Sequence, residues 1–367
     1  MKCYRVNRPV LEVSPDMLRQ YHISDEQVRQ FIPDYIRYLV SLEYGWGQRL
    51  LFLSVRVFLS SLVWVFLRPR RNAVGFLDQQ EVDEVYNHEA NYYDWKHHMT
   101  TRYKDTIWRR IAGWFVATLA RKNSKLRVLD LCTGTGLTVE GIQSVLMQWG
   151  LTAEVTGLDY NQRMLDRANA RNLPGVQFVR GDATRLTSGF QEKIGDEFEQ
   201  FERNSFDVVT QMCGIGGIPE PLDVFECVLR LLKPGGRFWM HDMHKPIPSL
   251  PGILPLLPKW LQSPALECYI YEEVCLPLVL KRLWGWRDPT ALFYLLPMVS
   301  YSDSNPKTNE KEYWGFEVEN FMVEPQRWWF GIPYMPVAQI IVKKVAISKE
   351  EAELRESLLI CCSQLPR

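Results

Sequence analysis

The chain has 367 residues, which is enough for one large domain with additions or for two domains. Hydrophobic residues make up 46% of it and charged residues 23%, as in an ordinary globular protein, and the formal net charge is zero. A neutral chain argues against a nucleic acid partner, because proteins that bind the phosphate backbone carry an excess of lysine and arginine.

The 8 cysteines include no C-x-x-C pair, and they are not near the histidines at the spacing of metal ligands. We therefore expect reduced, structural thiols and no metal site. The first residues show neither an early apolar run nor a small-residue cleavage site, so no secretory signal is predicted and the expected location is cytoplasmic.

Residues 1–80 predict an N-terminal helical extension before the main domain at 81–347. Ser14-Pro15-Asp16 and Ser24-Asp25-Glu26 each place a capping residue ahead of apolar residues at helical spacing. Residues 81–120, rich in tyrosine, tryptophan and histidine, predict a further pair of helices.

An apolar run at 50–67 has Arg56 as its only charged residue, and three arginines follow it. Three interpretations compete for this run: a buried core helix, a helix that lies on a membrane surface, and a transmembrane span. Arg56 would be costly at depth in a bilayer and fits a surface helix better. A membrane contact through 50–71 would place the protein on the cytoplasmic face, peripheral or anchored.

Residues 126–131 are mostly apolar and predict a strand that leads into Gly134, Gly136 and a helical pattern. Strand, tight loop and helix are the opening of a Rossmann-like unit, and the two glycines let the backbone approach a ligand closely. A dinucleotide fingerprint would need glycine or alanine where Val139 stands. Asp130, at the strand end, favours a ligand that carries a positive charge or an amino group.

Further strands are predicted after this one, with helices between them, at 155–159, 177–180, 205–210 and 238–242. Asp159 ends the second strand, about 20 residues past the glycines, the spacing at which a carboxylate can hold ribose hydroxyls. Gly181-Asp182-Ala183 follows the third strand, and the turn Lys233-Pro234-Gly235-Gly236 precedes the fifth. The alternation predicts a parallel sheet with helices on both faces.

In this order the motifs resemble the class I S-adenosyl-L-methionine (SAM) dependent methyltransferases, although the family pattern has a glycine where Cys132 stands. The resemblance narrows to the UbiE-type methyltransferases of ubiquinone and menaquinone biosynthesis. It rests on Tyr92-Tyr93-Asp94, on Met99 and Trp108-Arg109-Arg110, and on the stretch 157–165, and it covers about residues 85–242.

The resemblance implies an α/β fold with a Rossmann-like, seven-stranded sheet and helices on both faces. Strands at 316–321 and 337–345 would form its antiparallel end. Apolar residues broken by prolines at about 246–305 predict an inserted lid over the carboxyl edge of the sheet, where ligands lie in open α/β sheets. Residues 348–367 predict a charged, helical tail.

The resemblance also implies SAM as the cofactor. Asp130 and the two glycines would surround its methionine part, Asp159 would hold its ribose, and Asp182 would accept from its adenine amino group. Gln211 would face the methyl donor. The expected cofactor-binding residues are Tyr93, Asp130, Gly134, Gly136, Asp159, Asp182, Ala183 and Gln211.

Methyl transfer from a sulfonium needs alignment of nucleophile, methyl carbon and sulfur, and much of the acceleration can come from that positioning. A carbon or oxygen nucleophile on a ring must also lose a proton, and a histidine of near-neutral pKa suits that role. The expected catalytic bases are His241 and His244, which close the fifth strand, and Asp94.

The sequence thus predicts a SAM-dependent methyltransferase that acts on a small hydrophobic or lipidic acceptor, with C-methylation of a quinone-like ring as the nearest analogy. N- or O-methylation of a lipid head group or another metabolite is an alternative. A non-catalytic SAM-binding or membrane scaffold protein is an alternative of another class. A nicotinamide oxidoreductase is disfavoured by Val139 and by the Lys-Pro-Gly-Gly turn. The oligomeric state is not predicted.

Overall fold

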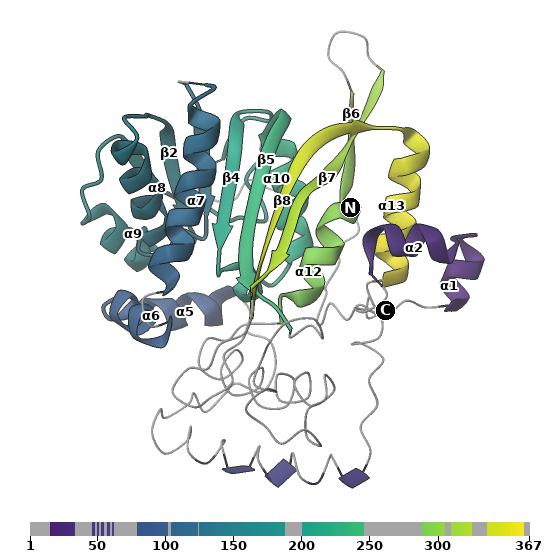
Figure 1. Ribbon diagram of the computed structural model, residues 1–367, viewed down its shortest axis with the longest axis horizontal. Coiled ribbons are helices and arrows are strands. Elements are labelled where there is room, and N and C mark those ends of the chain that lie inside the picture. Colours follow the sequence, from purple (N-terminus) through teal and green to yellow (C-terminus); the bar gives the residue numbers. More distant parts are fainter. Residues whose placement is uncertain are drawn as a thin grey trace.

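A computed structural model shows one central sheet with helices on both sides (Figure 1). The sheet has eight strands in the order β3-β2-β1-β4-β5-β8-β7-β6. The structure describes residues 15–33, 46–47, 50, 53–54, 57–58, 61, 79–101, 104–123, 125–187, 200–245, 288–304, 310–324 and 336–362.

The first half of the sheet is parallel and confirms the five predicted strands. β1 and β4 lie at its centre and are buried on both faces, which is why they read as continuous apolar runs. The bounds are β1 Arg127–Leu131, β2 Glu154–Asp159, β3 Val176–Arg180, β4 Phe206–Met212 and β5 Leu232–Met243.

The second half is antiparallel and corrects the predicted strand number from seven to eight. β7 (Lys311–Val323) and β8 (Val337–Ile347) are the two expected strands. The additional edge strand, β6 (Ser300–Ser304), pairs with β7. Its sequence is Ser-Tyr-Ser-Asp-Ser, in which only Tyr301 is buried, so it lacks the apolar alternation that would have predicted a strand.

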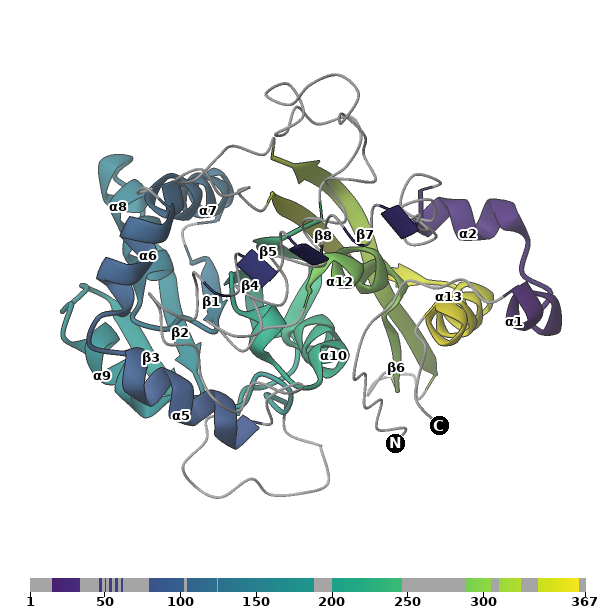
Figure 2. The ribbon, with the colours of Figure 1, turned by 90° about the horizontal axis from the view of Figure 1, so that it is seen from below.

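Helices cover both faces of the sheet (Figures 1 and 2). α7 (Lys104–Ala120) and α8 (Leu137–Gln148) share one apolar core with β1 and β4, and they cross closely at Gly113 and Gly141. A Cβ on Gly113 would lie 2.8 Å from the carbonyl oxygen of Gly141, so this crossing requires the glycine. α10 (Pro221–Leu231) and α12 (Thr290–Leu295) belong to the core of the other face.

The predicted lid at 246–305 falls into two parts. Residues 246–287 lie outside the described residues, and for them the lid stays a prediction. The described part that follows forms α12, the 3-10 turn η5 (Leu296–Met298) and β6. Because residues 291–299 are all buried in the core, this part belongs to the body of the sheet domain rather than to a lid.

Two helices lie across the carboxyl ends of the parallel strands, α5 (Gln79–Glu89) and α6 (Tyr93–Thr101) (Figure 1). The helical character predicted for residues 81–120 is confirmed, but α5, α6 and α7 are three helices where a pair was expected. α5 faces the start of α9 (Gln162–Asn169). Together α5 and α6 form a cap over this edge of the sheet.

The ends of the described chain meet beside the antiparallel strands (Figure 1). α1 (Pro15–Gln20) and α2 (Asp25–Phe31) begin where their caps predicted, and Ser24 and Gln27 form a complete capping box. α13 (Lys349–Cys362) is the expected C-terminal helix, and it shares a core with α2.

The apolar run at 50–67 lies for the most part outside the described residues, and with it the choice among core helix, surface helix and span. Of the helices that the structure does describe, none has the length and apolar character needed to cross a bilayer.

Candidate functional site

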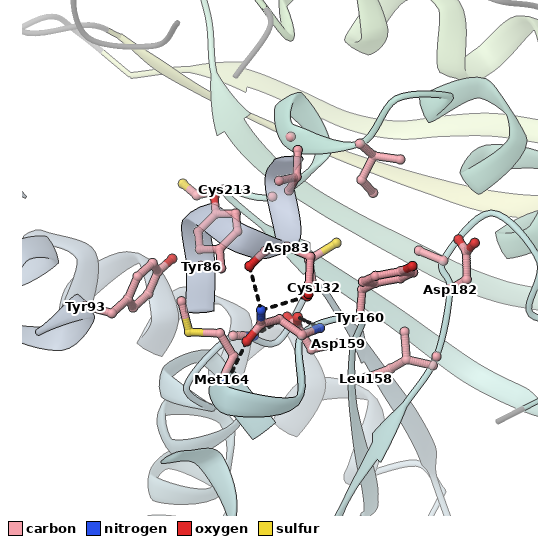
Figure 3. A pocket seen from close by; sticks show the side chains of 18 residues that line it. Asp83, Tyr86, Tyr93, Cys132, Leu158, Asp159, Tyr160, Met164, Asp182 and Cys213 are labelled. Carbon is pink, nitrogen blue, oxygen red and sulfur yellow. Dashed lines mark hydrogen bonds between the residues drawn. The ribbon is translucent and has the colours of Figure 1, made fainter. Parts of the chain in front are cut away.

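A cavity of about 710 Å³, counted with its open mouth, lies at the carboxyl ends of β1, β2 and β4 (Figure 3). Small-molecule sites in proteins commonly lie at this place in an open α/β sheet. The cap closes one side through Val82, Asp83 and Tyr86 of α5 and Tyr93 of α6. All described lining residues fall between Val82 and Ile218 in the sequence.

The glycine loop between β1 and α8 forms the floor of the cavity. Gly134 has a φ of +58°, and a Cβ built on it would meet nothing closer than the Tyr93 ring at 3.9 Å. The space above Gly134 is therefore the cavity itself. Gly136 (φ +83°) has another role: its Cβ would lie 3.0 Å from Phe178, so this glycine permits packing against β3 and does not line the cavity.

Asp130 lies beneath the glycine loop and does not line the cavity. Only 1% of it is exposed, and its two oxygens accept hydrogen bonds from Thr133 Oγ1 at 2.8 Å and Thr210 Oγ1 at 2.7 Å. Burial raises the pKa of this carboxyl to about 6, against the effect of both hydrogen bonds. The residue thus braces the loop from below rather than surrounding a ligand.

Asp159 and Asp182 both line the cavity. Their expected roles at a ribose and an adenine stay predictions. Asp159 accepts from the backbone N–H of Gly134 at 2.7 Å and of Asn161 at 2.9 Å, so it also joins β2 to the glycine loop. Burial raises its pKa to about 6, while these backbone hydrogen bonds lower it. Asp182 is held by the N–H and hydroxyl of Thr184, with Ala183 beside it in the wall.

Gln211 supports the turn after β4 and is fully buried beneath it. In the amide orientation that satisfies both its oxygen and its nitrogen, the side-chain oxygen of Gln211 accepts from the N–H of Gly214 at 2.7 Å and of Ile215 at 3.0 Å. The turn leads into the 3-10 helix η1 (Ile215–Gly217), which lines the cavity together with Cys213. Gln211 therefore shapes the methyl-donor side without lining it.

Tyr93 lines the cavity from the cap, as expected, and its ring packs on His97 with centroids 4.2 Å apart. Asp94, next to it, is engaged in another contact. Its carboxylate pairs with Arg171 and accepts from Thr135 Oγ1 at 2.5 Å, and Arg171 Nε donates to the Thr135 carbonyl at 2.5 Å. Asp94 thereby fastens the cap to the glycine loop. This arrangement suits a structural carboxylate rather than a proton acceptor.

The two histidines at the end of β5 differ. His244 has both ring nitrogens engaged, with the Lys245 carbonyl at 2.6 Å and the Tyr294 hydroxyl at 3.0 Å, and burial lowers its pKa to about 4. This arrangement suits a structural histidine. His241 is 2% exposed, stacks on Trp239, and within the described part of the chain its Nδ1 meets no hydrogen-bond partner.

The sequence did not single out the α5 wall of the site. Asp83 and Tyr86 stand across the cavity from Asp159 and Tyr160 in Figure 3. Asn161, which caps α9, also lines the cavity and donates to Asp83 Oδ1 at 2.8 Å. A capping residue two positions after Asp159 was the available signal, because a side chain at that point lies at the same edge of the sheet.

The family model and the curated relatives point to methyltransferases. Residues 122–269 match a family described as "Methyltransferase domain". Demethylmenaquinone methyltransferase of Lactococcus lactis subsp. lactis (strain IL1403) is 31% identical over 168 residues, 44% of this chain and 58% of the relative. The ubiquinone/menaquinone biosynthesis C-methyltransferase UbiE of Ectopseudomonas mendocina (strain ymp) is 32% identical over 172 residues, 46% of this chain and 59% of the relative. The chain thus spans less than two thirds of the length of these relatives.

Among solved structures, phosphoethanolamine N-methyltransferase 1 of Haemonchus contortus, in complex with phosphoethanolamine and S-adenosylhomocysteine, is 16% identical, with a TM-score of 0.45. The match covers 78% of this chain and 54% of that one. From the family match and the curated relatives, the chain carries a class I SAM-dependent methyltransferase domain, and over that domain it resembles the UbiE-type methyltransferases.

Proposed function

We propose that the chain transfers the methyl group of SAM to a small hydrophobic or lipidic acceptor. The observation that carries this proposal is the acidic cavity above the glycine loop. Three carboxylates line it, those of Asp83, Asp159 and Asp182, and its described lining residues include no lysine, arginine or histidine. Such a lining favours a cation such as a sulfonium and disfavours the pyrophosphate of a dinucleotide.

The residues present fit each part of SAM. Asp159 would bind the ribose hydroxyls, Asp182 would accept from the adenine amino group, and the open backbone at Gly134 leaves room for the methionine part. When bound, SAM supplies an electrophilic methyl group. The chain contributes position: the braces formed by Asp130 and Gln211 fix the two loops that border the methyl-donor end, so that alignment of the reactants costs little.

For the acceptor, we favour C-methylation of a quinone-like ring, the reaction named for the UbiE relative. A ring carbon becomes nucleophilic when a neighbouring hydroxyl loses its proton. His241 is our candidate acceptor for that proton. Burial, together with the charge of Arg109, lowers its pKa to about 3, so the imidazole is neutral but weakly basic. Arg109 would assist by stabilising the ring oxyanion, which lowers the pKa of the hydroxyl itself.

Calorimetry and a labelling assay test the proposal. We expect SAM and its demethylated product to bind with micromolar affinity and NAD not to bind. Asp159→Ala should weaken SAM binding by roughly 1–3 kcal/mol, because charge-assisted hydrogen bonds to the ribose are lost. Binding of NAD without SAM would overturn the assignment.

Incubation of a cell extract with methyl-labelled SAM identifies the acceptor. A labelled quinol supports ring methylation, whereas a labelled head group or other metabolite supports the N- or O-methyl alternative. Tight SAM binding with no labelled product in any extract fraction would favour a non-catalytic SAM-binding protein.

The proposal includes a membrane contact through residues 50–71, from which a lipidic acceptor would enter. Four of the described residues in this run are apolar and exposed: Leu50, Leu53, Val57 and Phe58, from 51% for Leu53 to 63% for Phe58. Exposed apolar side chains with a basic flank are typical of helices that lie in the plane of a membrane interface.

A further inference from the structure

The side chain of Asn161 joins three parts of the site. Its Oδ1 accepts from the N–H of Met164 at 2.9 Å and so caps α9. Its backbone N–H donates to Asp159 at 2.9 Å. Its Nδ2 donates across the cavity edge to α5, reaching Asp83 Oδ1 at 2.8 Å, the Asp83 carbonyl at 3.0 Å and Asn87 Oδ1 at 3.0 Å. One amide therefore connects the expected ribose carboxylate to the helix that forms the opposite wall.

The attachment of α5 depends on such polar contacts. Its sequence is largely polar, and of its described side chains only Val85 and Glu89 are fully buried. Further bonds to α9 come from exposed groups, as where Arg163 donates to the Asn87 carbonyl at 3.2 Å. Exposed bonds of this kind contribute little each, whereas Asn161 is only 3% exposed. A wall held this way opens at a lower free energy than the sheet it covers.

We propose that Asn161 and Asp83 form a latch that holds α5 closed over the bound cofactor and sets the rate at which the cofactor leaves. The proposal rests on SAM as the ligand of the cavity. Because Val82, Asp83 and Tyr86 all line the cavity, release of the latch moves a whole wall of the site away from the ligand. Asn161 and Asp83 are positioning residues in this arrangement.

The test uses a substitution that breaks only the latch. Asn161→Asp keeps the oxygen that caps α9, since aspartate is an equally good capping residue, but it replaces the N–H donor by an oxygen that faces the Asp83 carboxylate. We expect SAM dissociation, followed by stopped flow in the full-length chain, to become about tenfold faster. The melting temperature should remain close to that of the wild type.

Two matched variants separate the latch from charge and from direct contact. Gln162→Glu adds the same charge at the adjacent, exposed position, and its dissociation rate should equal that of the wild type. Asn161→Asp combined with Asp83→Asn exchanges donor and acceptor at constant net charge. We expect this double variant to return to within about threefold of the wild-type rate, because an amide again donates to a carboxylate.

The outcomes are distinct. An unchanged rate in Asn161→Asp, or a double variant as fast as the single one, overturns the latch. Equal acceleration by Gln162→Glu overturns it as well, because charge alone would then explain the effect. If the wild-type chain itself fails to bind SAM in calorimetry, the proposed function fails instead, whatever the variants do.

Discussion

At the scale of single residues, two cysteines of the cavity wall hold backbone conformations that favour glycine. Cys132 has a φ of +53° and Cys213 a φ of +51°, and both line the cavity. A non-glycine residue in this region costs about 1–3 kcal/mol. Such strain persists where the surroundings fix it, and here it lies in the two loops that border the expected methyl-donor end.

The contact between Cys132 and Gly214 tests how closely these two loops pack. A Cβ on Gly214 would lie 2.6 Å from the Cβ of Cys132, so Gly214→Ala should lower the free energy of unfolding by roughly 1–3 kcal/mol. In a Cys132→Gly background the clash disappears, and most of that loss should be recovered. Urea denaturation of the two single variants and the double variant measures the coupling. Additive effects would mean that the two loops do not touch in solution.

The expected cofactor residues fall into two groups in the structure. Asp159, Asp182 and Gly134 line the cavity, and their binding roles stay predictions. Asp130 and Gln211 also belong to the expected motifs, but their side chains point beneath the loops that they brace. A linear motif shows which residues cluster at one edge of a sheet, but it does not show on which side of the loop each side chain lies.

At the scale of elements, the cap and the glycine loop meet at Arg171. The contribution of the Asp94–Arg171 ion pair to the free energy of unfolding can be predicted. Asp94→Asn should reduce the free energy of unfolding by about 1 kcal/mol, since this ion pair is only partly buried. It should leave the pH dependence of kcat/KM unchanged. Loss of a true general base would instead lower kcat about 10²–10⁴-fold. Glu140→Gln, which breaks the more exposed contact of Arg171, is the matched control and should cost less.

The elements themselves were predictable where the chain is apolar and regular. The five parallel strands and the caps of α1 and α2 needed only periodicity and capping residues. β6 was missed because a short, polar edge strand is defined by its partner β7 rather than by its own residues. Residues 291–299 were assigned to the lid because prolines precede them, although their burial places them in the core.

At the scale of the whole molecule, Lys344 links stability to pH. Its side chain is fully buried and donates to Asn204 Oδ1, the Leu232 carbonyl and the Tyr301 hydroxyl. Burial lowers its pKa to about 7, and Asp303 opposes this effect in part. Above pH 7 the folded chain releases a proton that the unfolded chain keeps until about pH 10, so this lysine makes stability rise with pH in that range.

Lys344→Met should remove this rise. Between pH 6.5 and 8.5, the wild type should gain roughly 1–2 kcal/mol in free energy of unfolding relative to the variant. The comparison cancels the titration of the cysteines, which is common to both proteins. Lys311→Met, at an exposed lysine, should follow the wild type. Parallel pH curves for wild type and Lys344→Met would show that Lys344 does not titrate in this range.

The proposed membrane contact is also tested on the whole chain. We expect the intact protein to sediment with membranes, and deletion of residues 50–71 to release it while SAM binding is retained. A core helix would give the opposite result, because its deletion would unfold the catalytic domain. An intact chain that stays in the supernatant without detergent would refute the proposed contact.

The position of the cavity residues along the chain separates lining from support. Every described residue of the cavity wall precedes position 219, while β5, β7 and β8 come after it. The later part still supports the wall, because Asp242 of β5 accepts from the N–H of Ile215 at 3.2 Å. A chimera that joins the first 218 residues to a relative's remainder should therefore bind SAM only if the new strand pairs with β4 in the same register.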